Sequence, residues 1–304
     1  MSFPCAGFVN LSCNCATITA TMYRSRCVAA AFLLLLLRLP ANAQEASRIR
    51  EITASIAEGA DREARRSAIT KVLTASGIGF DLQEEGEPGR SLTNIVATVR
   101  GETSKTILLG AHYDRVAQGN GVLDNGASCA VLLNLLESLK ARPAALTVRV
   151  VFFDLEESGL IGSRAYFARG GNEPKPAYAV NLDIFGYGDS FFVASRNPAG
   201  TLTTKFQQAA GESNLAVRVS QPAQYPSSDH VSMIQVGIET LGIALIDGAE
   251  VDSVLGMVRG GQTPGAPPRV LTIIHTARDT MDILRPADVA KGAATLERFV
   301  RTLN

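Results

Sequence analysis

Two kinds of hydrophobic pattern alternate along most of this chain. Short runs of consecutive apolar residues predict strands covered on both faces, whereas apolar residues that recur every three or four positions predict amphipathic helices. Strands are predicted over residues 80–85, 92–99, 107–111, 148–153, 178–184, 191–194, 217–219, 240–246 and 271–274, and helices over residues 45–76, 123–139, 163–169 and 286–303. Because the two kinds of element alternate, we expect an α/β fold. It would be a three-layer sandwich in which helices flank a mostly parallel, mixed central sheet.

Residues 44–304 are expected to form one domain, because no linker interrupts this alternation. The segment 247–269 is rich in glycine and proline and directly precedes the last predicted strand. We predict that this segment is an insertion that covers the functional site as a lid.

The N-terminal residues 1–43 have the composition of a secretory signal peptide. Arg24 and Arg26 precede the apolar run 27–37, and Ala41-Asn42-Ala43 supplies a small-residue cleavage site. The apolar run, about eleven residues long, is too short to span a bilayer as a helix. No cysteine directly follows it, which disfavours a lipoprotein anchor. We therefore predict a secreted or periplasmic protein without a stable membrane anchor, whose true start is Met22.

The charge and cysteine content fit an exported enzyme. The chain holds 29 basic and 29 acidic residues, and the part after residue 43 is slightly acidic because residues 1–43 contain arginines but no acid. This balance gives no indication of binding to nucleic acid or to an anionic membrane. Cys129 is the one cysteine beyond residue 43, so export without an internal disulfide predicts a bacterial type of periplasmic or secreted protein.

Histidines and carboxylates gather where predicted strands end. The set comprises His112, Asp114, Asp124, Glu156, Glu157, Asp183, His275 and Asp279. Imidazole and carboxylate are the ligands that zinc prefers. In an α/β sheet, ligands bind beyond the carboxyl ends of the strands. Since the chain has three histidines and two of them bracket this set, the pattern predicts a two-metal hydrolytic site.

Each feature also has an ordinary structural explanation when it is taken alone. Residues 112–114 would form a hydrogen-bonded pair, Asp124-Asn125-Gly126 a turn, and Glu156-Glu157 a solvated pair. Asp183 ends an apolar strand, where a buried carboxylate needs a cation or hydrogen-bond donors. His275 would be a core histidine. The occurrence of all these features at one predicted edge favours the metal site.

Several motifs together resemble a known enzyme family over roughly residues 90–300. They are Gly110-Ala111-His112-Tyr113-Asp114, Asp124-Asn125-Gly126-Ala127, Phe153-Asp154-Leu155-Glu156-Glu157 with Gly162-Ser163-Arg164, Asn181-Leu182-Asp183, Ser228-Asp229-His230, His275-Thr276 and Asp279-Thr280. As an ordered set they resemble the co-catalytic two-zinc aminopeptidases of metallopeptidase family twenty-eight, which are leucine-aminopeptidase-like. The resemblance implies the fold of the zinc-dependent exopeptidases.

The resemblance also implies a cofactor of two zinc ions and a role for each ligand. Asp124 would bridge both ions. His112 and Asp183 would complete the site of one ion, and Glu157 and His275 the site of the other.

A general base and a supporting carboxylate are implied beside these ligands. Glu156 would take the proton from the water shared by the two zinc ions and pass it to the leaving amine. Asp114 would accept the second imidazole N–H of His112 and fix its tautomer. The family also places a cis peptide bond after the bridging aspartate, which would be Asp124-Asn125 here.

Contacts with the substrate are predicted with less support. His230 lies in a segment that lines the pocket in the family, and Tyr225 and Asp229 are the neighbouring residues expected to contact substrate. Tyr225 has the alternative of a packing residue beside Pro226. Cys129 is interpreted as a small buried hydrophobic residue within its helix.

The predicted function is a secreted metallo-aminopeptidase that cleaves N-terminal residues from peptide substrates. Two other enzymes on the same scaffold are alternatives. A metallocarboxypeptidase would need basic residues for a C-terminal carboxylate, and Arg115 and Arg164 are present. A glutaminyl-cyclase-like enzyme typically has an aromatic residue before the final histidine, where this chain has Ile274. A non-catalytic peptidase-like binding domain is a third alternative, disfavoured because Glu156 and all the ligand positions are present. The oligomeric state is left open.

Overall fold

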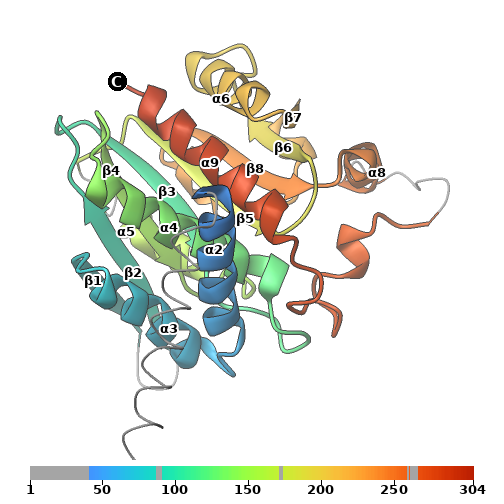
Figure 1. Cartoon of the computed structure of the whole chain (residues 1–304), viewed down its shortest axis with the longest axis horizontal. Coiled ribbons are helices and arrows are strands. Elements are labelled where there is room, and N and C mark those ends of the chain that lie inside the picture. The colour runs from blue at the N-terminus through green and yellow to red at the C-terminus, as the bar shows by residue number, and fades with distance from the viewer. Residues whose placement is uncertain (1–40, 87–90, 171–173, 259, 261–265) are drawn as a thin grey trace, which may run out of the picture. The chain divides into compact units, whose positions relative to one another are not determined.

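The computed structural model describes residues 41–86, 91–170, 174–258, 260 and 266–304 (Figure 1). The chain separates into two compact units, residues 1–44 and 45–304. The predicted basic and apolar parts of the signal peptide and the proposed start at Met22 lie outside the described residues. The division between the units lies within one residue of the predicted cleavage position, and cleavage itself stays a prediction.

An eight-stranded mixed sheet forms the middle layer of the second unit, in the order β1-β2-β4-β3-β5-β8-β6-β7. The strands are β1 (Phe80–Glu85), β2 (Leu92–Val99), β3 (Thr106–His112), β4 (Thr147–Phe153), β5 (Tyr178–Phe185), β6 (Ser190–Ser195), β7 (Ala216–Ser220) and β8 (Glu239–Ile246). The neighbours β4, β3, β5 and β8 run parallel to one another. Their carboxyl ends therefore meet at one edge, which is where the site forms.

Helices cover both faces of this sheet, which confirms the predicted α/β sandwich. They are α2 (Ala41–Ala57), α3 (Arg62–Ala75), α4 (Ala127–Ala141), α5 (Ile161–Ala168), α6 (Thr201–Glu212), α7 (His230–Gln235), α8 (Gly248–Val258) and α9 (Pro286–Thr302). The apolar residues of α4, α6 and α9 share one core cluster on one face, whereas those of α5 and α7 pack in a separate cluster on the other.

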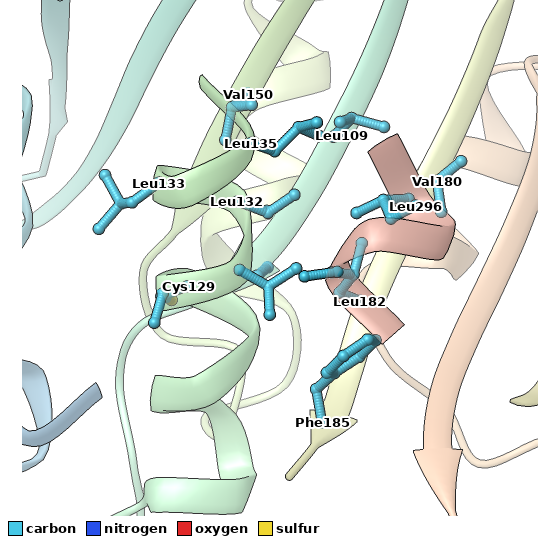
Figure 2. Packing of buried hydrophobic residues seen from close by; sticks show 14 of the residues in the cluster. Leu109, Cys129, Leu132, Leu133, Leu135, Val150, Val180, Leu182, Phe185 and Leu296 are labelled. Carbon is cyan, nitrogen blue, oxygen red and sulfur yellow. The ribbon is translucent and has the colours of Figure 1, made fainter. Parts of the chain in front are cut away.

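Alternating side chains of the central strands fill these two cores. Leu109 belongs to the cluster under α4, and its neighbour Leu108 belongs to the cluster under α5. Figure 2 shows Leu132 of α4 and Leu296 of α9 among the side chains that meet the strands on the first face. Because both faces are covered, the strands have the continuous apolar sequences that predicted them.

The first predicted helix is in fact two helices. Instead of one helix over residues 45–76, α2 ends at Ala57 and α3 begins at Arg62. Asp61 is extended, with φ of −139°, and its side chain accepts a hydrogen bond from the backbone N–H of Ala64. This N-cap starts a new helix. The prediction was wrong here because the apolar spacing continues across the break.

The strand predicted over residues 271–274 does not form. A short 3-10 helix, η3 (Val270–Thr272), takes its place, with Val270 and Ile273 buried in an apolar cluster. A four-residue apolar run does not distinguish a strand from a buried turn. His275 therefore lies on a loop and not at the end of a strand.

Two helices, α6 and α7, were not predicted, and the segment 247–269 contains the helix α8. Residues 259 and 261–265 of that segment lie outside the described residues. Within the described part of the chain, no helix has the length and apolar character needed to cross a membrane.

Candidate metal centre

Four segments bring the predicted ligands together at the carboxyl edge of the sheet. His112 is the last residue of β3, Glu157 follows β4, Asp183 lies near the end of β5, and Asp124 lies in the turn η1 (Val122–Gly126) before α4. The loop after η3 adds His275.

Asp124 lies between the two histidines. Its Oδ1 is 3.1 Å from Nε2 of His112, and its Oδ2 is 3.0 Å from Nε2 of His275. Each histidine also has a second carboxylate. Asp183 Oδ1 is 3.5 Å from His112 Nε2, and Glu157 Oε2 is 3.1 Å from His275 Nε2. The five residues thus form two half-sites that share one aspartate.

The donor set fits metal ions. His112, Asp124 and Glu157 present ligand atoms that all lie within 4.8 Å of one another. Oε1 of Glu157 and Oδ1 of Asp183 are buried without a hydrogen-bond partner among the described residues. Buried carboxylate oxygens need a donor or a cation. Imidazole nitrogen with carboxylate oxygen is the donor set of zinc sites.

The two half-sites differ in exposure. The His112 side chain is 1% exposed, whereas that of His275 is 52% exposed. One half-site is therefore enclosed within the fold and the other opens to solvent.

Asp114 supports both the strand end and the glutamate pair. Its Oδ1 is 3.4 Å from Nδ1 of His112, close enough for electrostatic attraction but without hydrogen-bond alignment. It also accepts the backbone N–H groups of Glu156 at 3.0 Å and Glu157 at 3.2 Å. One buried carboxylate thus connects the segment after β3 with the segment after β4.

Asp279 holds the segment that carries the shared aspartate. Its carboxylate accepts the backbone N–H groups of Val122, Leu123 and Asp124 at 3.0, 2.8 and 3.3 Å. Asp279 belongs to the polar set predicted at the strand ends, where its residue type alone assigned it no role. Its signal was its position four residues after a candidate ligand.

The backbone is unusual at the site. The Asp124-Asn125 peptide bond is cis, as expected from the resemblance. Leu155, Ile184 and His275 have φ of 53°, 64° and 57°, a region that residues other than glycine rarely adopt. The register of β5 shifts between Leu182 and Phe185, and such bulges redirect side chains near sites.

The concentration of carboxylates perturbs the pKa values of the metal-free site. Burial raises the pKa of Glu156 to about 9 and that of Glu157 to about 7, with further increases from neighbouring carboxylates. The hydrogen bond to Asp124 raises the pKa of His275 to about 9. Burial alone would lower the pKa of His112, but its carboxylate neighbours raise it well above the ordinary value. The crowded carboxylates thus favour the binding of protons or cations at this site.

Glu156 differs from Glu157 in its contacts. Its carboxylate makes no hydrogen bond or ion pair with the described residues, whereas Glu157 pairs with His275. The backbone N–H of Glu156 is held by Asp114, so the residue is fixed while its carboxylate stays available. That arrangement suits a proton acceptor.

Two pockets border the ligand set. A cleft of about 670 Å³ is lined by Asp114 and Glu157 together with Arg62 and Ser158. A smaller, mainly apolar pocket borders Asp183 and is lined by residues that include Tyr225 and Val254. The ligands thus border a large cleft with both charged and apolar lining and a smaller, mainly apolar pocket.

The three residues predicted to contact substrate differ in position. Tyr225 lines the apolar pocket and packs against Phe192, with ring centroids 4.6 Å apart. Asp229 and His230 are 0% exposed, and their side-chain polar atoms have no hydrogen-bond partner among the described residues. The geometry gives no support to substrate contact by Asp229 and His230, so for these two it stays a prediction.

The family model of peptidase family M28 matches residues 94–300. The chain belongs to this family. A probable leucine aminopeptidase of Arthroderma otae is 26% identical over 223 residues, covering 69% of this chain and 57% of the relative. Aminopeptidase YwaD of Bacillus subtilis is 30% identical over 146 residues, or 44% of this chain and 30% of the relative. This M28 chain therefore spans little more than half the length of the first of these relatives.

Solved structures share the fold at lower identity. The glutaminyl cyclase of Porphyromonas gingivalis superposes with a TM-score of 0.67 at 20% identity, covering 84% of this chain and 98% of the cyclase. LapA aminopeptidase of Legionella pneumophila gives a TM-score of 0.65 at 16% identity, covering 84% of this chain and 68% of LapA. The M28 fold of this chain is thus common to peptidases and cyclases, and the fold alone does not select between them.

Proposed function

We propose that this M28 chain is a two-zinc aminopeptidase that releases N-terminal apolar residues from peptides. The observation that carries the proposal is the position of Asp124, whose two oxygens face two different histidines, each with its own second carboxylate. In this proposal, His112 and Asp183 hold one ion, Glu157 and His275 hold the other, and Asp124 binds both.

The chain's own residues supply the proton transfer. Two zinc ions held by these residues would supply an acidified water and polarisation of the scissile carbonyl. Glu156 accepts the proton from that water and delivers it to the leaving amine, since its carboxylate is otherwise unpaired. Burial raises the pKa of Tyr225 well above its ordinary value, which keeps the phenol protonated. Tyr225 is therefore the candidate donor to the carbonyl oxygen.

The two pockets support an assignment of the substrate's parts. The apolar pocket beside Asp183 suits the side chain of the N-terminal residue, with its ammonium group near the site carboxylates. The cleft beside Glu157 suits the leaving peptide, because it is larger and its lining combines charged and apolar residues. Val254 of α8 lines the apolar pocket, so the described part of the proposed lid forms a wall of that pocket.

A carboxypeptidase fits this site less well. Arg115 donates to the backbone carbonyls of Ala60, Val116 and Ala117 through the two terminal nitrogens of its guanidinium. Arg164 is exposed on α5 and lines neither pocket. Arg164 is therefore not placed to hold a C-terminal carboxylate, and Arg115, although it lines the cleft, already has backbone carbonyls as partners.

Glutaminyl cyclisation is the second candidate function. It is supported by the fold of a solved glutaminyl cyclase, 98% of which this chain covers, but a solved leucine aminopeptidase precursor of Bacteroides thetaiotaomicron is covered to 97%, so the covered length does not separate the two activities. The presence of Ile274 before His275, instead of an aromatic residue, counts against it. Release of ammonia from a peptide with N-terminal glutamine would identify this activity.

The test is hydrolysis of a leucine dipeptide and of its N-acetylated form, before and after chelation and with zinc returned. We expect cleavage of the free-amine substrate alone, loss on chelation and recovery with zinc. The Glu156→Gln variant is the matched control, because it should bind zinc but not hydrolyse the peptide. Cleavage of both substrates, or cyclisation without cleavage, would refute the aminopeptidase proposal.

We also propose that residues 1–43 direct export. The order of basic, apolar and small residues supports this, and one relative is a probable lipoprotein aminopeptidase, LpqL of Mycobacterium tuberculosis, 34% identical over 110 residues, or 32% of this chain and 22% of LpqL. Mass spectrometry of the protein expressed in a bacterium should find Gln44 at the N-terminus of an extracytoplasmic form. An intact N-terminus retained in the cytoplasm would contradict the proposal.

A further inference from the structure

A positively charged side chain is completely buried behind the metal centre. Arg65 of α3 is 0% exposed, and no ion pair is formed by it within the described part of the chain. Its guanidinium instead donates to three backbone carbonyls, those of Tyr113, Asn120 and Gly121. Buried arginines are rare without a partner carboxylate, so the location of these carbonyls requires an explanation.

The three carbonyls adjoin two of the three segments that carry the enclosed half-site. Tyr113 lies between His112, a candidate ligand, and Asp114, which supports it. Gly121 directly precedes the turn η1, in which Asp124 lies, and its carbonyl also accepts the N–H of Gly126. The guanidinium therefore connects the end of β3 with the start of η1. A planar group with donors in a fixed fork suits this task.

The turn between α2 and α3 is shaped to admit this arginine. A Cβ at Gly59 would lie 2.6 Å from Cγ of Arg65 and 2.8 Å from its backbone nitrogen, which is too close. Asp61 caps the helix and accepts the backbone N–H of Arg65 through its carbonyl at 3.1 Å. Glycine and aspartate in this turn thus fix the position from which Arg65 reaches the site.

The charge of Arg65 complements the surrounding carboxylates. Burial lowers its pKa, while the charges of Asp114 and Asp279 raise it. These two carboxylates are the ones that hold the glutamate pair and the η1 segment. A fixed cation beside them offsets part of the negative charge that gathers there.

We propose that Arg65 is a positioning residue for the metal centre, supplied by a helix outside the segment that the M28 family model matches. It sets the separation between His112 and Asp124 through their neighbouring carbonyls. The inference rests on the proposed zinc site and adds a requirement for the α2–α3 turn. A fragment with all the ligands but without this helix would lack the guanidinium that orders them.

The test compares Arg65→Met and Arg65→Lys with a control, Ile69→Ala. Ile69 is one helical turn further along α3 and is also 0% exposed, so its truncation destabilises the same helix without touching the site carbonyls. Zinc stoichiometry and dissociation constants are measured by competition with a chromophoric chelator, beside the melting temperature of each metal-free protein.

We expect Arg65→Met to weaken zinc binding by about 10–100-fold, the usual effect of removing a group that supports a ligand. Arg65→Lys should fall between this variant and the wild type, because one ammonium cannot reach three carbonyls. Ile69→Ala should lower the melting temperature and keep the zinc affinity. If Arg65→Met does not fold, the zinc affinity of Arg65→Lys tests the inference alone.

Zinc affinity unchanged in a folded Arg65 variant would overturn the inference, as would equal weakening in Ile69→Ala. Wild-type protein that binds two zinc ions but cleaves no peptide would refute the proposed function and leave the role of Arg65 standing. Wild-type protein that binds no zinc would refute both.

Discussion

The substitution Asp279→Asn tests whether the η1 segment is held for metal binding. Asparagine keeps one of the two carboxylate oxygens. The bonds from Val122 and Leu123 to Oδ1, at 3.0 and 2.8 Å, would survive with a neutral acceptor. The bond from Asp124 to Oδ2, at 3.3 Å, would be replaced by an amide group facing an N–H. The variant therefore weakens two hydrogen bonds and loses the third.

The magnitude follows from the strengths of charged and neutral hydrogen bonds. Bonds to charged groups contribute about 1.5–3 kcal/mol and neutral ones about 0.5–1.5 kcal/mol, so two weakened bonds and one lost bond together amount to about 5 kcal/mol. In the metal-free protein, the lost repulsion between Asp279 and Asp124 offsets part of this cost. In the zinc-bound protein that repulsion is already neutralised. The repulsion relieved in the metal-free protein is therefore the part of the change that appears in zinc binding, and zinc affinity should be weakened by up to about 100-fold.

The assay is a zinc titration monitored by a competing chelator, with melting temperatures of metal-free and zinc-loaded protein. Asp282→Asn is the control, because Asp282 is exposed, lies three residues further along and loses the same formal charge. Asp279→Asn with zinc affinity within twofold of the wild type would refute the reasoning. Equal weakening in Asp282→Asn would assign the effect to net charge.

Four further outcomes are expected. Glu156→Gln should lower kcat by about 10²–10⁴ with unchanged zinc stoichiometry, and initial rates that stay within tenfold would contradict its role as base. Val254→Phe should raise KM for leucine substrates more than for alanine substrates, and an unchanged ratio of KM values would remove this residue from the pocket. Burial raises the pKa values of Glu156, Glu157 and Asp229 to about 9, 7 and 7 in the metal-free protein, so the folded state binds protons that the unfolded state has released. Metal-free stability should therefore fall as pH rises from about 4.5 to 9, and a melting temperature that increases over this range would be inconsistent with it. Leu132→Ala should lower the free energy of unfolding by about 2–5 kcal/mol in urea denaturation, and a smaller loss would mean that the core collapses into the space.

The strands and the residues at their ends were the predictable part of this molecule. β1 and β2 have the bounds that the hydrophobic pattern predicted, and β3 and β4 differ by a residue at one or both ends. Longer strands covered on both faces have a continuous apolar sequence, and the residue that follows such a strand is placed by it. His112 and the glutamate pair after β4 were predictable for this reason.

The features that the sequence did not predict depend on contacts between distant segments. The break between α2 and α3 is set by Asp61 and by the packing of Arg65 against Gly59, neither of which alters the apolar spacing. His275 reaches the site from a loop with φ of 57°, although a strand was expected before it. The roles of Asp279 and Arg65 consist of hydrogen bonds to backbone groups far along the chain. A pattern of residue types does not reveal such bonds, because every residue has a backbone carbonyl and nearly every residue a backbone N–H that can be the partner.

The buried thiol of Cys129 gives the protein a built-in probe of local opening. Its Sγ donates to the carbonyl of His112 at 3.1 Å, and burial raises the pKa of the thiol to about 12. A thiol reagent needs both access and thiolate, so it should label the folded protein very slowly. The labelling rate would then report how often α4 and the end of β3 separate. Zinc that joins the two segments through Asp124 and His112 should slow this reaction, without any substrate being present.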